Sequence, residues 1–110
     1  MASTHDYKID TRNEKIKIYV DGQFYKRNDA KISVMDSGYL LGDGVWEGIR
    51  LHKNKLIHVD EHLKRLYEGA DKISMNIGLK PEVLKSILYD TLKQNNMNSD
   101  VHIRLIISRG

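Results

Sequence analysis

Two segments with helical spacing of apolar residues lie among segments whose apolar residues alternate, and this order limits the chain to few folds. One helix is predicted over residues 61–75, with Asp60 as its N-cap. A second helix begins at Pro81, because proline suits the first helical position. Alternation predicts strands over 15–20, 23–26, 45–51 and 101–108. The predicted fold is α+β: a mainly antiparallel sheet with two helices packed on it.

Turns and loops separate these segments. Asp21-Gly22 is a residue pair typical of a two-residue type I′ hairpin turn. A short strand is expected over 31–34, and a turn at 53–55 leads into another over 56–59. Three glycines within residues 38–44 predict a loop whose backbone turns sharply or approaches another segment closely.

The length of 110 residues is typical of one domain. The polar, aperiodic residues 1–14 are predicted to form a loose N-terminal arm, and residues 15–110 a single domain. No apolar run approaches the roughly 18 residues that a membrane span needs, and no apolar stretch near residue 1 suits a signal peptide. A cytoplasmic protein without a membrane partner is therefore expected.

Composition excludes several kinds of site. The absence of cysteine excludes disulfides, cysteine zinc sites and thiol nucleophiles, and it suits a reducing compartment. The net charge is only +3 and the cations are interleaved with acids, so no nucleic-acid partner is expected. His58 and His62 are separated by the start of the predicted helix, so no metal site is expected. The glycines at 42–44 are too few for a nucleotide-phosphate loop and precede a strand.

The last predicted strand carries a candidate anion site. Because side chains alternate along a strand, His102 and Arg104 share one face and lie about 7 Å apart. A guanidinium beside an imidazole is well shaped to hold a carboxylate or phosphate. The alternative is the solvated face of an edge strand.

The strand at 45–51 carries Trp46, Gly48 and Arg50 on one face. The glycine leaves a gap between large side chains, which either admits a ligand or lets another strand pack closely. Glu47 points the opposite way, among aliphatic residues, so it requires a partner or a place at the sheet margin. Lys31 and Arg50 are the candidate partners.

The first predicted helix turns a cation away from its apolar stripe. At 100° per residue, Arg65 projects about 130° from the axis of that stripe. It is either a solvated surface residue or a group aimed at something outside this domain's core. The stripe consists of Leu63, Leu66, Tyr67, Ala70 and Ile73.

Three ordered motifs resemble the class IV aminotransferases, pyridoxal phosphate (PLP) enzymes that include branched-chain and D-amino-acid aminotransferases. Residues 33–50 read SVMDSGYLLGDGVWEGIR, 60–66 read DEHLKRL, and 102–110 read HIRLIISRG. The resemblance covers residues 18–110. It implies the small-domain fold of the fold-type IV PLP enzymes and transfer of an amino group between an amino acid and a 2-oxo acid, with PLP as cofactor.

The resemblance also implies residue roles. Arg65 matches the arginine that binds the PLP phosphate. Trp46 falls at an aromatic wall of the substrate pocket, and Gly48 matches a glycine that lines it. His102 and Arg104 correspond to the tyrosine and arginine that receive the substrate, and the arginine suits a dicarboxylate such as glutamate.

Departures from the branched-chain pattern leave the substrate side chain open. Trp46 replaces phenylalanine or tyrosine, and His102 and Leu41 each replace a tyrosine. The Schiff-base lysine of the family lies in a second domain after the point matching Gly110, so no catalytic residue is assigned within this chain.

The chain is therefore expected to be the N-terminal small domain of a homodimeric, branched-chain-like aminotransferase, incomplete without its large C-terminal PLP domain. Its end in the apolar strand 101–108 agrees with an interior piece of a longer protein, and a natural terminal edge strand is the alternative. Two other functions stay open. One is a non-catalytic module that binds a ligand or partner; the other is an enzyme like aminodeoxychorismate lyase, which Glu47-Gly48 disfavours.

Overall fold

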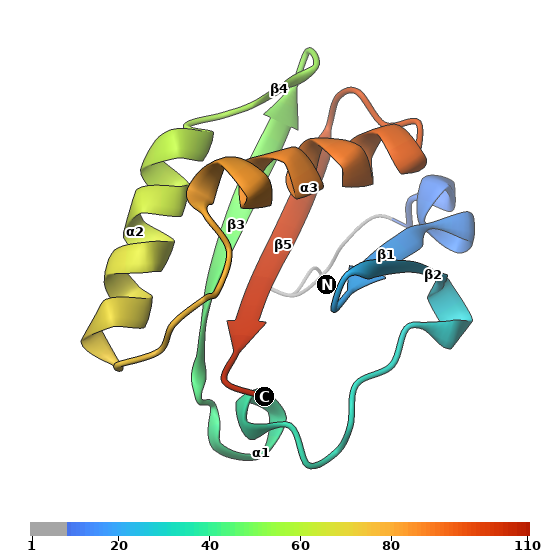
Figure 1. Cartoon of the computed structure of the whole chain (residues 1–110). Helices are drawn as coiled ribbons and strands as arrows, with labels where there is room; N and C mark the ends of the chain where they lie inside the picture. The colour runs from blue at the N-terminus through green and yellow to red at the C-terminus, as the bar shows by residue number, and fades with distance from the viewer. Residues whose placement is uncertain (1–8) are drawn as a thin grey trace, which may run out of the picture. The chain divides into compact units, whose positions relative to one another are not determined.

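The computed structural model describes residues 9–110, which contain five strands, three α-helices and two short 3-10 helices (Figure 1). These residues divide into two compact units, one ending at Lys31 and the other running from Ile32 to Gly110. Residues 1–8 of the predicted arm lie outside the described residues. The prediction of a single domain over 15–110 stays a prediction.

The first unit contains the predicted hairpin. β1 (Lys17–Val20) pairs antiparallel with β2 (Gln23–Lys26). Asp21 and Gly22 both have positive φ, +46° and +94°, as a type I′ turn requires, so this prediction is confirmed. β1 begins at Lys17 rather than at residue 15 because a 3-10 helix, η1 (Thr11–Lys15), precedes it. A second one, η2 (Arg27–Asp29), follows β2.

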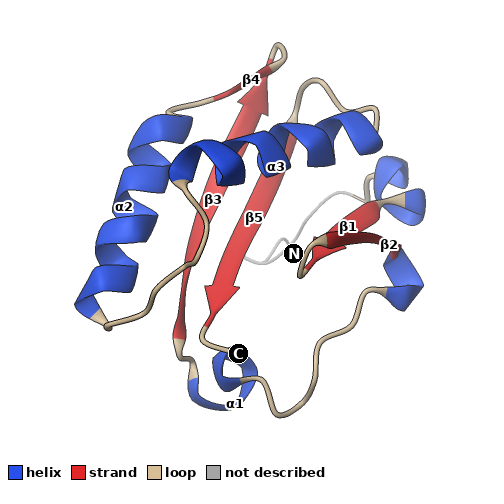
Figure 2. Cartoon of the chain, viewed as in Figure 1, coloured by secondary structure: helices blue, strands red, loops and turns tan. Residues whose placement is uncertain are grey.

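The second unit contains a three-stranded antiparallel sheet in the order β4-β3-β5 (Figure 2). β3 (Gly44–His52) is central, β4 (Lys55–Leu56) pairs with its last two residues, and β5 (Val101–Ser108) runs alongside it. The bounds of β5 agree with the prediction, and β3 extends slightly beyond 45–51. Register fixes which side chains are neighbours: it pairs Trp46 with Ile106, Gly48 with Arg104 and Arg50 with His102.

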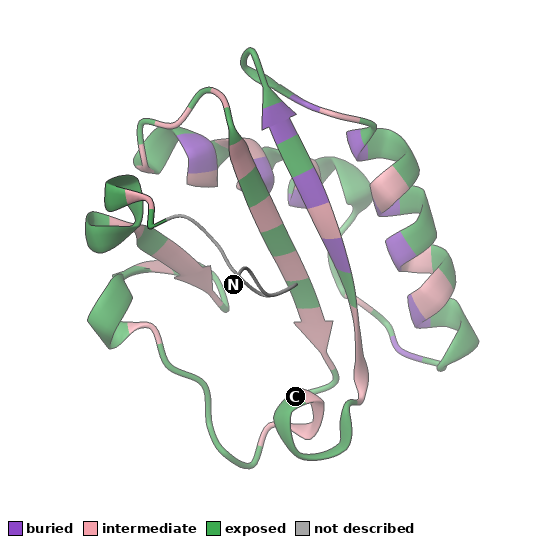
Figure 3. Cartoon of the chain, turned by 180° about the vertical axis from the view of Figure 1, so that it is seen from behind, coloured by how far each residue is buried: buried purple, intermediate pink, exposed green. Residues whose placement is uncertain are grey.

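The helices α2 (Val59–Lys72) and α3 (Pro81–Gln94) pack on one face of this sheet. Burial alternates along β3, as Figure 3 shows from the opposite side. The predicted α+β fold is therefore confirmed. Among the described residues, no helix has the length and apolar character needed to cross a membrane. The buried core joins β3, β4, α2 and α3 through Ile49, Leu51, Leu56, Val59, Leu63, Leu66, Leu84, Leu88 and Leu92.

The start of α2 differs from the prediction. The helix begins at Val59, and its N-cap is His58, which has a φ of +53° and no side-chain cap bond. The predicted Asp60 cap is wrong because Asp60 lies inside the first turn, where a carboxylate is favoured by the helix dipole. The helix ends at Lys72, so Ile73 is exposed instead of completing the apolar stripe.

The segment before β3 also differs from the prediction. Residues 31–34 form no strand, and the side chains of Ile32 and Val34 are exposed. The glycine-rich loop contains a short helix, α1 (Ser37–Leu41), capped by the Asp36 carboxylate, which accepts the Gly38 N–H at 2.8 Å. Gly42 ends α1 in the left-handed conformation with a φ of +66°, so the expected sharp turn is confirmed at this glycine.

Candidate ligand-binding site

An exposed tryptophan lies beside an arginine on the sheet face opposite the helices. Trp46 on β3 is 59% exposed, and Arg104 on the neighbouring strand β5 lies next to it. The guanidinium carbon lies 4.8 Å from the centre of the indole ring, which is a cation–π contact. Because Arg104 is paired with Gly48, two residues beyond Trp46, this contact runs diagonally across the strand pair.

Gly48 leaves open space on this face. A Cβ placed there would lie 3.8 Å from Trp46 Cζ3 and would meet no other atom of the described residues within 4 Å. The glycine therefore produces an indentation and does not serve to let another strand pack closely. The predicted gap is confirmed, and its occupation by a ligand stays a prediction.

His102 lies on the same face as Arg104, as predicted, and both residues are exposed. Across the strands His102 pairs with Arg50, and the two line a shallow depression together with Asp100 and Val101. Two guanidiniums and an imidazole thus lie along one stretch of sheet. Such a surface favours an anionic ligand that also has an apolar part to place against the indole.

Glu47 faces the helices and is buried, with 5% of the residue exposed. Its carboxylate accepts two bonds from Arg65 in a fork, Nε to Oε2 at 3.0 Å and Nη2 to Oε1 at 2.7 Å. His62 Nδ1 lies 2.6 Å from the same Oε1. The need for a partner is thus confirmed, whereas Lys31 and Arg50 as candidate partners are wrong. Both partners come from α2, whose position over the sheet no local pattern specifies.

The bonds from Arg65 hold the pKa of Glu47 below its ordinary value of 4.5, against the raising effect of burial, and His62 lowers this pKa further. The same bonds raise the pKa of Arg65, so the guanidinium stays charged. The pair is asymmetric: 71% of the Arg65 side chain is exposed, against 6% of the Glu47 side chain. The Arg65 side chain therefore projects away from the core as predicted, and the Nε and Nη2 side of its guanidinium is bonded to Glu47.

The structure brings four of the five predicted site residues together and places the fifth elsewhere. Trp46, Gly48, His102 and Arg104 share the open face of β3 and β5. Arg65 is bonded to Glu47, on the face that the helices cover. No cluster of three or more acidic, histidine or cysteine residues suited to a metal ion occurs within residues 9–110.

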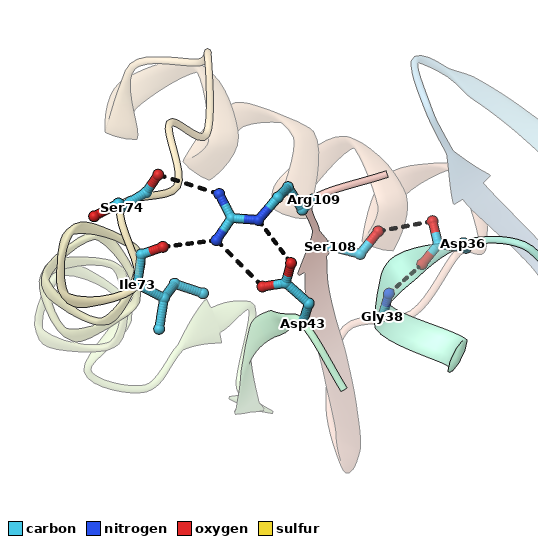
Figure 4. Close-up of polar contacts among 7 residues, drawn as sticks. All are labelled: Asp36, Gly38, Asp43, Ile73, Ser74, Ser108 and Arg109. Carbon is cyan, nitrogen blue, oxygen red and sulfur yellow. Dashed lines mark hydrogen bonds and ion pairs between the residues drawn. The ribbon is translucent and has the colours of Figure 1, made fainter. Parts of the chain in front are cut away.

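Two contacts that the sequence did not predict hold the end of β5 against α1 and the residues around it (Figure 4). Ser108 Oγ donates to Asp36 Oδ2 at 2.8 Å, and Arg109 binds Asp43 through Nε and Nη2 at 2.6 and 3.2 Å. The only signal in the sequence is that Asp43 stands between two glycines, which does not identify a partner 66 residues away. These contacts fix one end of the strand pair that carries Trp46 and Arg104, the end where Gly44 pairs with Ser108.

Residues 44–110 match the family described as "Amino-transferase class IV". A protein of Methanocaldococcus jannaschii, provisionally named a branched-chain-amino-acid aminotransferase, is 42% identical over 95 residues, which are 86% of this chain and 33% of that protein. The D-alanine aminotransferase of Staphylococcus haemolyticus is 37% identical over 89 residues, covering 80% of this chain and 32% of that enzyme.

Solved structures give the same result. The branched-chain amino acid aminotransferase of Escherichia coli matches with a TM-score of 0.81 at 27% identity, covering 87% of this chain and 34% of that one. The 4-amino-4-deoxychorismate lyase of Pseudomonas aeruginosa matches with a TM-score of 0.61 at 29% identity, covering 74% and 28%. The chain spans about a third of the length of the curated relatives just named. The family match, over more than half of the chain, agrees with the fold and the three motifs, and the chain belongs to the class IV aminotransferases.

Proposed function

We propose that this chain is the N-terminal small domain of a PLP-dependent aminotransferase that moves an amino group between an amino acid and a 2-oxo acid. The observation that carries the proposal is the stack of Arg104 on Trp46 beside the gap at Gly48. A cation, an aromatic wall and an empty position are what an amino acid substrate needs for its carboxylate and its side chain. The proposal includes a branched-chain-like substrate and a homodimeric, cytoplasmic complete enzyme.

Arg104 and His102 are proposed to receive a substrate carboxylate. The guanidinium offers two parallel N–H donors to a carboxylate, and His102 lies two residues away on the same face. Trp46 and the space at Gly48 then bound the substrate's side chain, so the size of residue 48 limits which side chains enter. A dicarboxylate partner such as glutamate makes use of Arg104 and of Arg50, which pairs with His102 across the two strands.

The residues present fit PLP at its phosphate end. Arg65 commits two of its five N–H donors to Glu47 and keeps the other three on a largely exposed side chain. Such a guanidinium suits a phosphate oxygen. Bound PLP supplies the electron sink that amino-group transfer needs. Arg65 is proposed to anchor the phosphate and so to fix where the reactive ring lies relative to the open face.

The test is a comparison of the 110-residue chain with the full-length protein. Amino-group transfer from leucine to 2-oxoglutarate and absorbance of bound PLP are measured for both. The full-length protein is expected to be active and the 110-residue chain inactive, since the family's Schiff-base lysine belongs to the large domain. Turnover by the 110-residue chain would overturn the proposed incompleteness, and failure of the full-length protein to retain PLP would overturn the enzyme proposal.

Two alternatives have distinct outcomes in the same assay. A lyase like the Pseudomonas aeruginosa neighbour consumes 4-amino-4-deoxychorismate and does not transfer amino groups. A non-catalytic binding module retains neither PLP nor activity, although it still binds a carboxylate at Arg104. The branched-chain and D-alanine relatives favour the transferase. Comparing L-leucine with D-alanine as donor decides the stereochemistry.

A further inference from the structure

We infer that Glu47 is a positioning residue for Arg65: it fixes the guanidinium so that the remaining N–H donors are presented to an anion. The inference rests on the proposed role of Arg65 toward the PLP phosphate. It adds a residue, on a different element, to which no role was assigned from the sequence motifs.

Both oxygens of the Glu47 carboxylate contact Arg65. Oε2 accepts from Nε at 3.0 Å, and Oε1 accepts from Nη2 at 2.7 Å. Two parallel bonds define the plane of the guanidinium, which a single bond does not. The fork occupies one edge of the group. Nη1 and the second hydrogen of Nη2 are left for a ligand.

The difference in burial between Glu47 and Arg65 indicates which residue orients the other. Glu47 is 5% exposed on a central strand, and its backbone is fixed by pairing with Leu105. A buried carboxylate is costly unless it is paired, so this group is a fixed point. Arg65 is the exposed member, because 71% of its side chain is accessible, and among the described residues its guanidinium is hydrogen-bonded to Glu47. The strand therefore orients the arginine, and not the reverse.

His62 holds the other member of the pair in place. It precedes Arg65 by three residues on α2, so both side chains reach the same carboxylate from one helix face. Its Nδ1 lies 2.6 Å from Glu47 Oε1 and resists rotation of the carboxylate. One strand residue and two helix residues thus form a small rigid unit behind the exposed N–H donors.

A competing role for Glu47 predicts the opposite effect on phosphate binding from a positioning role. If the carboxylate competes with the ligand for Arg65, removing its charge strengthens phosphate binding. If it positions Arg65, removing its charge weakens phosphate binding. The charge-neutral, nearly isosteric substitution Glu47→Gln therefore separates the two.

The experiment measures the affinity of the full-length protein for PLP and for pyridoxal, which lacks the phosphate, by equilibrium dialysis. The ratio of the two affinities isolates the phosphate contribution from every other contact of the ring. Arg65→Ala is expected to reduce the ratio by roughly tenfold or more, the effect of losing bonds to a charged group. Glu47→Gln is expected to reduce it by about threefold to tenfold. In the double variant, the loss should equal that of Arg65→Ala alone.

Two further variants keep the test decisive. Leu63→Ala damages the core of the same helix without touching the pair, and it is expected to leave the affinity ratio unchanged. Arg65→Lys keeps the charge on an exposed side chain but cannot form the fork, so it is expected to lose nearly as much as Arg65→Ala. This variant carries the test if Glu47→Gln does not fold.

Each outcome has one meaning. An unchanged or increased ratio in Glu47→Gln overturns the positioning role. Additive losses in the double variant also overturn it, and so does a ratio kept by Arg65→Lys. If Arg65→Ala leaves the ratio unchanged, the proposed phosphate role of Arg65 is wrong, which is a separate result.

Discussion

Arg109 and Asp43 form a forked ion pair between residues 66 positions apart, with Nε to Oδ2 at 2.6 Å and Nη2 to Oδ1 at 3.2 Å. The same guanidinium donates to the carbonyl oxygens of Ile73 and Ser74, immediately after α2 (Figure 4). One side chain thus joins the end of β5, the residue before β3 and the end of α2. The two strands that carry the candidate site are held together at this point.

Arg109→Lys is predicted to lower the melting temperature of the protein by roughly 5 °C. An ammonium group cannot reproduce a planar fork and two carbonyl contacts at once. Thermal unfolding followed by circular dichroism measures the effect. The matched control is Arg12→Lys, since the bonds from Arg12 to Asp10 span only two residues and are exposed. Equal melting temperatures for the two variants would show that the Arg109 contacts contribute nothing particular.

Two glycines in β3 predict opposite outcomes for the same substitution. A Cβ at Gly44 would lie 2.6 Å from the Ile107 carbonyl oxygen and 3.2 Å from Ser108 Cα, so Gly44→Ala forces the strands apart. We expect it to destabilise the protein by about 2–3 kcal/mol in urea unfolding. Gly48→Ala places its methyl group in open space, so its stability should change by less than about 1 kcal/mol.

The proposed function predicts that Gly48→Ala, the variant with the smaller loss of stability, has the larger effect on substrate preference. Gly48→Ala fills the gap beside Trp46, and it should raise the KM for leucine more than the KM for alanine. Gly44→Ala, where it folds, should affect both donors alike because it is remote from the side-chain slot. A Gly48→Ala enzyme with unchanged preference between the two donors would contradict the proposed slot.

Local patterns in the sequence were enough to predict much of the fold. The alternation along 101–108, the turn at Asp21-Gly22 and the helix beginning at Pro81 each depend on residues close together in the chain. For the same reason, the side-chain faces of β3 and β5 were predictable. Once a strand is identified, the face of every residue follows from its position.

Features that depend on how elements dock were not predictable. The partner of Glu47 depends on the rotation of α2 about its axis and on its position along β3. The apolar stripe restricts both, but it does not determine where the charged end of each basic side chain lies. The strand expected at 31–34 had suitable alternation, but the sheet of the second unit contains only β3, β4 and β5. The strand expected over 56–59 ends at Leu56, before the left-handed His58, and no local pattern in the sequence marks that position.

The Glu47–Arg65 pair predicts how stability depends on pH. Because the folded pKa of Glu47 lies below its ordinary 4.5, the stabilisation from the pair is fully present above about pH 4.5. It is lost as pH falls through the lowered folded pKa, where the native carboxylate is protonated. Glu47→Gln is expected to be less stable by about 1–3 kcal/mol at pH 7 and to lose less stability on acidification. Urea unfolding at pH 7, 4.5 and 3 measures both quantities.

The difference in stability between the wild type and Glu47→Gln at each pH separates the contribution of Glu47 from that of the other acidic residues. Asp36, whose pKa is lowered first by the Ser108 hydrogen bond, loses stabilisation over the same acidic range in both proteins. Parallel stability curves for the wild type and Glu47→Gln below pH 4.5 would mean that the pair contributes no pH dependence.

Trp46 is the only tryptophan in the chain, so its fluorescence reports directly on the candidate carboxylate site. Arg104 lies against the indole ring, with its guanidinium carbon 4.8 Å from the ring centre. A carboxylate that binds Arg104 competes with this weak contact, because a forked ion pair is stronger than an exposed cation–π contact. Titration with glutarate, an unreactive dicarboxylate, is therefore predicted to change the emission of Trp46 with saturation.

Substitutions on the same sheet face test which residues bind the carboxylate that changes the Trp46 emission. Arg104→Ala should abolish the glutarate response or weaken its affinity at least tenfold, the loss expected for removing a charged hydrogen-bond donor. Arg50→Ala, on the same face and paired with His102, should keep the response to acetate and lose part of the preference for glutarate over acetate. A dicarboxylate needs two cations separated along the sheet, whereas a monocarboxylate needs one. If Arg104→Ala responds to glutarate like the wild type, the carboxylate binds elsewhere and the open face is not the substrate site.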